Sequence, residues 1–134
     1  MPQEQDMKTI QWYPGHMEKT RRAIAANLKL VDAVAELVDA RTPVSSRNPE
    51  IDRITAKKPR IVVLNKADLA DPSTTDSWIS YFKKQGLTAM AVDCRSGRGV
   101  NKLLPTVRSV VLKDLMEKRE RNGRSNESVR LMML

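Results

Sequence analysis

The 134-residue sequence has few of the features that mark secreted or membrane proteins. It holds one cysteine, Cys94, which excludes an internal disulfide and fits a reducing compartment. No apolar run approaches the roughly 20 residues that span a bilayer. The polar start, Met1 to Asp6, lacks the apolar stretch of a secretory signal. We therefore expect a cytoplasmic protein with no membrane partner.

Aromatic residues make up only 4% of the sequence, which argues against RNA recognition by base stacking. Basic residues, by contrast, are abundant: 24 Lys and Arg against 16 Asp and Glu leave a net charge of +8. Such a balance favours a polyanionic partner, most simply RNA. The length suits one domain, and an apolar content of 40% is adequate for its core.

Apolar runs alternate with helical patterns along the chain. Strands are predicted at 31–38, 60–64, 87–92 and 128–134, and helices at 17–29, 48–57, 71–85 and 101–121. In the last helix an apolar stripe is expected to run from Leu104 through Val107 and Val111 to Leu115. The alternation predicts an α/β fold, a parallel sheet of about four strands with flanking helices. Residues 1–11 are expected to form a flexible tail, and 12–134 the folded portion.

The most informative motif is Asn65-Lys66-Ala67-Asp68, which directly follows the apolar run Ile61–Leu64. Ligands of parallel α/β sheets bind at the carboxyl ends of strands, where this motif falls. The Asp68 carboxylate can accept both donors on one edge of guanine, and adenine would leave it wrongly paired. Asn65 can reach the base carbonyl, and the Lys66 stem can cover the base. A polar turn after a strand is the alternative interpretation, since Asn and Asp favour turns.

Further motifs occur together in one order: Gln11–Met17 (QWYPGHM), Glu36–Arg41 (ELVDAR), Ser46–Pro49 (SRNP) and Lys58–Asp68. With them, nearly the whole chain resembles the circularly permuted ribosome-assembly GTPases of the RbgA (YlqF) type. The resemblance implies a partial Ras-like P-loop NTPase fold whose guanine loops precede the phosphate loop. It places that P-loop directly after a strand like 128–134. We therefore expect an N-terminal fragment that lacks the P-loop and switch regions, hydrolyses no GTP itself and binds guanine nucleotide weakly.

The same resemblance implies further site residues. Asp93, Cys94 and Arg95 would form the second guanine-contacting loop, in which a backbone N–H meets the base carbonyl. His16, the only histidine, would orient the attacking water. Bound GTP or GDP is implied, with Mg²⁺ expected only in the intact GTPase.

Basic residues gather near the start of the first predicted helix and the end of the last. The resemblance implies a role in large-subunit assembly, so these side chains are candidates for contact with rRNA of the large ribosomal subunit. They are Lys19, Arg21, Arg22, Lys118, Arg119 and Arg121, with Lys113 and Arg124 nearby. A solvated helix surface is the alternative for each of them.

By analogy with the superfamily, the last strand should lie beside 31–38 as an exposed edge, which invites self-association. Two other functions stay open from the sequence. One is a non-enzymatic RNA-binding α/β module, and the other is a scaffold that binds guanine nucleotide without hydrolysis.

Overall fold

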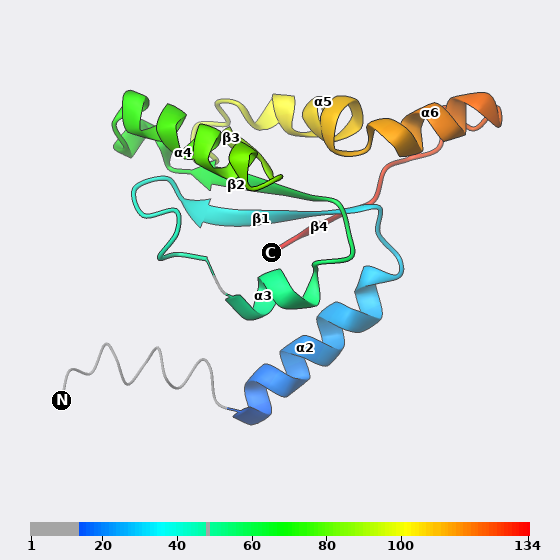
Figure 1. Cartoon of the computed structure of the whole chain (residues 1–134), viewed down its shortest axis with the longest axis horizontal. Coiled ribbons are helices and arrows are strands. Elements are labelled where there is room, and N and C mark those ends of the chain that lie inside the picture. Colours follow the sequence, from blue (N-terminus) through cyan, green and yellow to red (C-terminus); the bar gives the residue numbers. More distant parts are fainter. Residues whose placement is uncertain (1–13, 48) are drawn as a thin grey trace. The chain divides into compact units, whose positions relative to one another are not determined.

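The computed structural model describes residues 14–47 and 49–134, with side chains from residue 18 onward. The chain divides into two compact units at residue 30. In the first unit the described part is helix α2 (Pro14–Leu28), which confirms the predicted helix with an earlier start. Within α2, Glu18 forms ion pairs with Arg21 and Arg22. The second unit, 31–134, contains the sheet (Figure 1).

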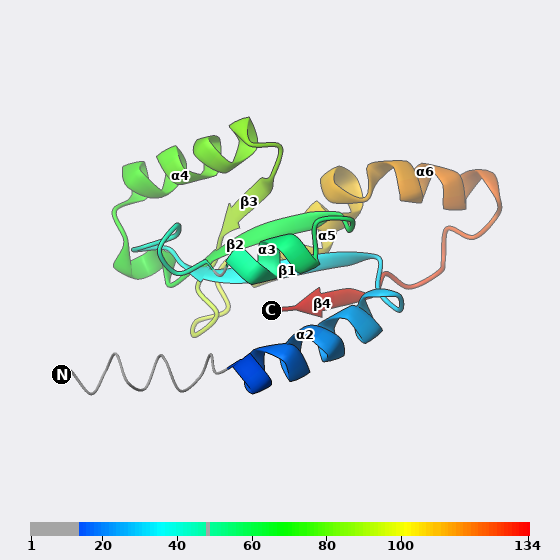
Figure 2. The ribbon, with the colours of Figure 1, turned by 60° about the horizontal axis from the view of Figure 1, so that its bottom comes forward.

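The second unit is built on a four-stranded parallel sheet of order β3-β2-β1-β4, seen from a second direction in Figure 2. Its strands are β1 (Ala33–Asp39), β2 (Arg60–Asn65), β3 (Thr88–Ala91) and β4 (Leu131–Met133). The predicted fold class is confirmed. The expected position of the last strand is also confirmed, because β4 pairs with β1 and forms one edge of the sheet.

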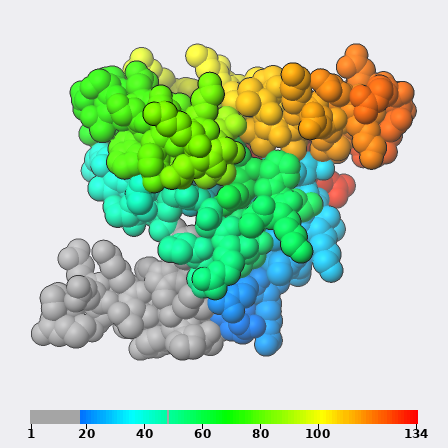
Figure 3. Space-filling view, viewed as in Figure 1, coloured from blue at the N-terminus to red at the C-terminus, as the bar shows by residue number. Residues whose placement is uncertain are grey.

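The two central strands are covered on both faces, which explains their nearly continuous apolar sequences. On one face, Ala33, Ala35, Ile61 and Val63 pack with the 103–116 segment. On the other face, the side chains of β1 and β2 pack with helix α4 (Pro72–Lys84), whose Phe82 is fully buried. Helix α3 (Pro49–Ile54) lies at the lower edge of the second unit in the view of Figures 1 and 3.

Helix α4 lies within the helix predicted at 71–85, and residues at its two ends explain its bounds. Asp71 caps it by accepting a hydrogen bond from the Thr74 N–H, and Pro72 occupies the first position. Gly86, with φ +79°, ends it. None of the helices in the described ranges is long and apolar enough to cross a membrane.

The single helix predicted over 101–121 is wrong. The segment consists of a 3₁₀ turn η2 (Val100–Lys102), helix α5 (Leu103–Thr106), a π-helical turn η3 (Val107–Val111) and helix α6 (Lys113–Arg121). In η3 the Leu112 N–H donates to the Val107 carbonyl at 2.7 Å, five residues back. The wider turn brings both Val107 and Leu112 into the core and leaves Leu104 48% exposed. The predicted apolar stripe therefore fails at its first residue.

Candidate functional site

The carboxyl ends of β2 and β3 carry two loops that hydrogen bonds join directly. Asn65 Oδ1 accepts from the Cys94 N–H at 3.0 Å, across 29 residues of sequence. The Ala67 N–H donates to the Val92 carbonyl at 3.1 Å. The structure thus brings together the two segments that the sequence predicted as guanine loops.

The turn after β2 presents Asp68 to solvent. Lys66 has φ +62°, the only positive φ among the non-glycine residues of the described ranges. This left-handed residue starts the 3₁₀ turn η1 (Ala67–Leu69). Asp68 is exposed, and within the described part of the chain its carboxylate has no hydrogen-bond or ion-pair partner. A carboxylate in that state is available to accept donors from a ligand.

A cavity of about 730 Å³ lies beside Asp68, which is within the range of small-molecule sites. Its walls come from η1, the start of α4, the end of β3 and the following loop. The lining residues include Ala67, Asp68, Thr75, Asp76, Asp93, Arg98, Gly99 and Lys102. Asn65, Lys66, Cys94 and Arg95 do not line it. The cavity therefore overlaps the predicted guanine site only around Ala67, Asp68 and Asp93.

The loop after β3 is held by its own first residue. The Asp93 carboxylate accepts from the Arg95 N–H at 3.1 Å and from Ser96 Oγ at 2.7 Å. The Ser96 hydroxyl, above all, lowers the pKa of Asp93. Two backbone N–H groups of the predicted guanine-contacting loop are therefore already paired, that of Arg95 with Asp93 and that of Cys94 with Asn65.

Gly99 completes the same loop and could not readily be another residue. Its φ is +82°, and a Cβ at this position would lie 2.9 Å from the Ala91 carbonyl oxygen. Gly97 has the same φ but open space around it. The backbone at Gly99 therefore lies too close to β3 to leave room for a side chain.

A charged cluster lies at the tip of β1. Asp39 is the register partner of Asn65 in the neighbouring strand. Its carboxylate accepts from Arg41 Nε at 2.9 Å and from Arg41 Nη2 at 2.6 Å, and lies 3.6 Å from Lys66 Nζ. The Arg41 side chain is the main cause that lowers the pKa of Asp39 far below its usual range. Asp39 and Arg41 fall in a motif that carries the resemblance, but no role was predicted for either from the sequence.

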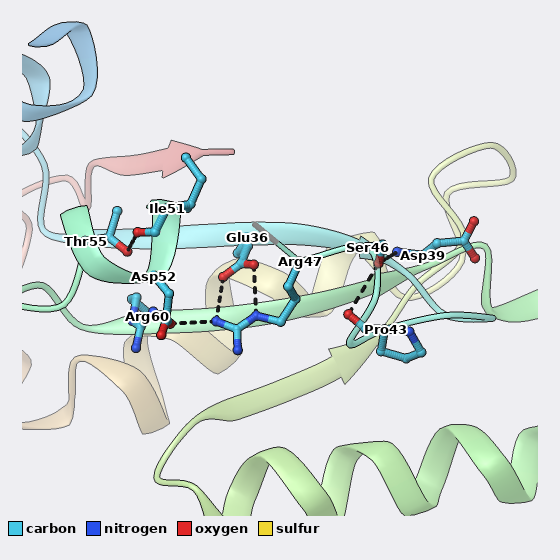
Figure 4. Close-up of polar contacts among 9 residues, drawn as sticks. All are labelled: Glu36, Asp39, Pro43, Ser46, Arg47, Ile51, Asp52, Thr55 and Arg60. Atoms are coloured by element: carbon cyan, nitrogen blue, oxygen red, sulfur yellow. Dashed lines mark hydrogen bonds and ion pairs between the residues drawn. The ribbon is translucent and has the colours of Figure 1, made fainter. Parts of the chain in front are cut away.

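A second charged cluster lies against the sheet, as Figure 4 shows. Arg47 forms a bidentate ion pair with the buried Glu36, at 2.9 and 3.0 Å. Its Nη2 also donates a hydrogen bond to the Asp52 carboxylate at 2.7 Å. Arg60 also donates to Asp52, and the Arg47 guanidinium lies 5.6 Å from the centre of the Phe82 ring. This network was not predicted from the sequence. Its signal was Glu36, an acidic residue within an otherwise apolar strand.

The predicted RNA-contact residues differ in their surroundings. Lys19, Arg22, Lys118 and Arg121 are exposed. Arg119 requires a correction: it is 8% exposed, its guanidinium pairs with Asp32 at 3.2 Å, and it donates to the Ser128 carbonyl. These contacts join α6 to the chain around β1 and β4, so the guanidinium is committed to the fold rather than free for a phosphate.

Two further points concern the predicted catalytic histidine and a possible metal site. His16 lies in α2, but its side chain is outside the described residues. In the described ranges no group of three or more His, Cys, Asp or Glu side chains could hold a metal ion.

Comparisons with known proteins identify relatives across most of this sequence. It is 45% identical to ribosome biogenesis GTPase A of Priestia megaterium over 126 residues, which are 94% of this chain and 44% of that protein. It is 46% identical to the protein of the same name from Bacillus cereus, over 93% of this chain and 42% of that one. Mitochondrial ribosome-associated GTPase 1 of Bos taurus is 36% identical over 75% of this chain and 30% of its own length. No protein-family model matches.

A solved structure supports the same relationship. The GNP-bound YlqF of T. maritima aligns with a TM-score of 0.57 and 32% identity, over 86% of this chain and 41% of that one. The chain spans less than half the length of each of these relatives. Over the stretch that it shares with them, the chain is similar to ribosome biogenesis GTPase A and to YlqF.

Proposed function

We propose that this chain is the guanine-recognising portion of a GTPase that acts in assembly of the large ribosomal subunit. The names of its relatives support a GTPase of ribosome biogenesis. The observation that carries the proposal is the bond from the Cys94 N–H to Asn65, which joins the two predicted guanine loops beside the exposed Asp68 carboxylate. This arrangement favours guanine binding over the rival RNA-binding module. Turnover of GTP by a protein that includes the phosphate loop separates a GTPase from the other rival, a scaffold that binds guanine nucleotide without hydrolysis.

The roles of the site residues follow from their hydrogen-bonding groups. Asp68 accepts the ring N–H and the amino group of guanine. Asn65 uses its Oδ1 for Cys94, which leaves the Nδ2 donor for the base carbonyl. The ring nitrogen of adenine is an acceptor and would face the carboxylate without a proton between them, so adenine is rejected.

Hydrolysis requires parts that this sequence does not show. No segment matches the glycine-rich lysine motif of a phosphate loop, which supplies backbone N–H groups and a lysine to the phosphates. In the circularly permuted order, that loop and the Mg²⁺ ligands would follow the guanine loops. We infer that the 134-residue chain hydrolyses no GTP and binds guanine nucleotide weakly. Turnover by this chain, or an affinity in the micromolar range, would contradict this inference.

Nucleotide titrations followed by NMR test the proposed specificity. GDP should shift the amide signals of Asn65, Asp68 and Cys94, and ADP at the same concentration should leave them nearly unchanged, because only guanine satisfies the Asp68 carboxylate. Equal responses to the two nucleotides would favour the rival RNA-binding module, in which Asn65–Asp68 is an ordinary turn.

His16 is proposed as the residue that orients the attacking water. The proposal rests on the resemblance in its Pro-Gly-His motif and concerns a protein that includes the phosphate loop. In such a protein, His16→Ala should slow GTP hydrolysis and leave GTP affinity nearly unchanged. Turnover equal to that of the parent protein would refute the role.

Contact with rRNA is proposed for Lys19, Arg21, Arg22, Lys118 and Arg121, on the net charge of +8 and the ribosome-related names of the relatives. Replacing Lys118 and Arg121 together by Gln should weaken RNA binding and reduce its dependence on salt, because two phosphate contacts are lost. The exposed Lys83 and Lys84 at the end of α4 make a matched control pair. Equal effects of the two double variants would indicate non-specific attraction by charge.

Self-association is proposed through β4, the edge strand beside β1. A dimer at high concentration, measured by analytical ultracentrifugation, is the expected result. A monomer at all concentrations would contradict it.

The cytoplasmic location also stays a prediction.

A further inference from the structure

We propose that Asp39 is a positioning residue for the guanine site. Its carboxylate holds the Lys66 side chain where the methylene groups can cover the base. The proposal rests on the proposed guanine-binding function. It concerns the tip of β1, whereas the residues assigned to the base so far follow β2 and β3.

The geometry places Asp39 directly beside the guanine loop. Asp39 and Asn65 are register partners at the ends of adjacent strands, and the Ala40 N–H donates to the Asn65 carbonyl at 2.7 Å. Lys66 is the next residue, and its Nζ lies 3.6 Å from Asp39 Oδ2. Because Lys66 already has a left-handed backbone, its side chain leaves the loop in a direction that the turn sets.

The Asp39 carboxylate is itself held firmly. Arg41 binds it through its backbone N–H at 2.9 Å and through the two guanidinium contacts. The Asp39 N–H donates to Ser46 Oγ at 3.0 Å. The residue after Ser46 is Arg47, which is anchored to the buried Glu36. The loop from Arg41 to Arg47 therefore fixes Asp39 from both sides.

The charges around Asp39 keep it ionised. Arg41 and Lys66 both lower its pKa, Arg41 by far the more, while partial burial acts in the opposite direction. Asp68 acts on the same cluster, since its charge helps to raise the pKa of Arg41. Arg41 therefore interacts with both Asp39 and Asp68, and Asp39 Oδ2 lies near two cations, Arg41 Nη2 at 2.6 Å and Lys66 Nζ at 3.6 Å.

Restraint of the Lys66 stem lowers the entropy cost of base binding. A free lysine loses considerable rotamer freedom when its methylene groups settle over a flat ring. An ion pair already formed at Nζ would remove part of that loss before the nucleotide binds. The Asp39–Lys66 contact is largely solvent-accessible, at 22% and 51% side-chain exposure, so the expected effect is only a few-fold.

A double-mutant cycle on this chain tests the proposal, with GDP binding measured by NMR titration. We expect Asp39→Asn to weaken GDP binding about fourfold and Lys66→Met about tenfold, and the double variant also about tenfold, because Asp39 acts through Lys66. Asp32→Asn is the matched control: Asp32 is also ion-paired, but lies just before the opposite end of β1. It should lower thermal stability and leave GDP affinity unchanged.

A measurement without ligand makes the result decisive. The ¹³C relaxation of the Lys66 Cε methylene should show greater mobility in Asp39→Asn than in the parent chain, and no change in Asp32→Asn. Independent, multiplying effects of Asp39→Asn and Lys66→Met on affinity, or unchanged Lys66 mobility, would overturn the positioning role. If the parent chain bound ADP as well as GDP, the proposed function would fail, whereas the mobility readout would still decide the role of Asp39.

Discussion

A cluster of charged residues packed against the sheet and a single carboxylate at the carboxyl ends of its strands are arranged in opposite ways. Between α3 and the strands, Glu36, Arg47, Asp52 and Arg60 form a closed network, in which each charge meets an opposite one (Figure 4). At the carboxyl ends of the strands, Asp68 is exposed and has no such partner among the described residues. The contrast separates charges that hold the fold from a charge that is available to a ligand.

The difference has a physical origin in burial. Glu36 is 5% exposed, and a buried carboxylate without an opposite charge would cost several kcal/mol. Asp68 lies in water and incurs no such cost, so its carboxylate can stay unpaired until donors arrive. Asp39 is intermediate: it is paired within the fold, yet it contacts a residue of the candidate site.

Removal of Arg47 should have the largest effect on the fold. Arg47→Ala leaves Glu36 buried and unpaired, so the free energy of unfolding should fall by about 3–5 kcal/mol in urea denaturation. Replacement of both members, as Glu36→Leu with Arg47→Met, should recover most of that loss, because neither charge is then buried. A double variant as unstable as Arg47→Ala would show that the network does more than neutralise Glu36.

Gly99 tests the loop that carries the second candidate segment. Gly99→Ala should destabilise the chain by about 1–3 kcal/mol, from a strained φ and a Cβ clash with the Ala91 carbonyl. Gly97→Ala is the matched control, since it has the same φ of +82° and open space. Thermal unfolding of both variants isolates the clash. Equal losses would mean that the close approach to β3 is relaxed at little cost.

Acid should weaken the closed network by a smaller amount. Arg60, above all, lowers the pKa of Asp52, so the ionised carboxylate stabilises the fold above its unfolded pKa of about 3.9. That stability is lost as the pH falls below this value, toward the lower pKa of the folded state. The fall in Tm between about pH 5 and pH 2 should therefore be smaller in Asp52→Asn than in the parent chain. Identical pH profiles would contradict this account.

The sheet could be predicted from the sequence because its signals are local. The strand predicted from the apolar run Ile61–Leu64 and the helix predicted at 71–85 each depend on adjacent residues, and the structure forms β2 and α4 there. The π-helical turn at Val107–Val111 had no such signal, because it depends on how Val107 and Leu112 both fit the core. Propensity and periodicity assume a uniform turn and cannot report one wider turn.

The candidate site was predictable in its segments and not in its pairings. The residues Asn65–Asp68 predicted a loop. The hydrogen-bond partner of Asn65, Cys94, lies 29 residues away, and only the resemblance indicated that its segment belongs to the site. Arg119 was assigned to RNA because its partner Asp32 is 87 residues distant in sequence. Pairings of this kind arise from the topology, which brings β1, β4 and the end of α6 together.

The central claim is that the Asp68 carboxylate selects guanine, and Asp68→Asn tests it most directly. The amide can donate a proton, which suits the carbonyl that xanthine carries where guanine has its amino group. We expect the preference of this chain for GDP over xanthosine diphosphate to reverse in Asp68→Asn, while Asp76→Asn, in the same cavity wall, keeps the preference of the parent. An unchanged preference in Asp68→Asn would contradict the account.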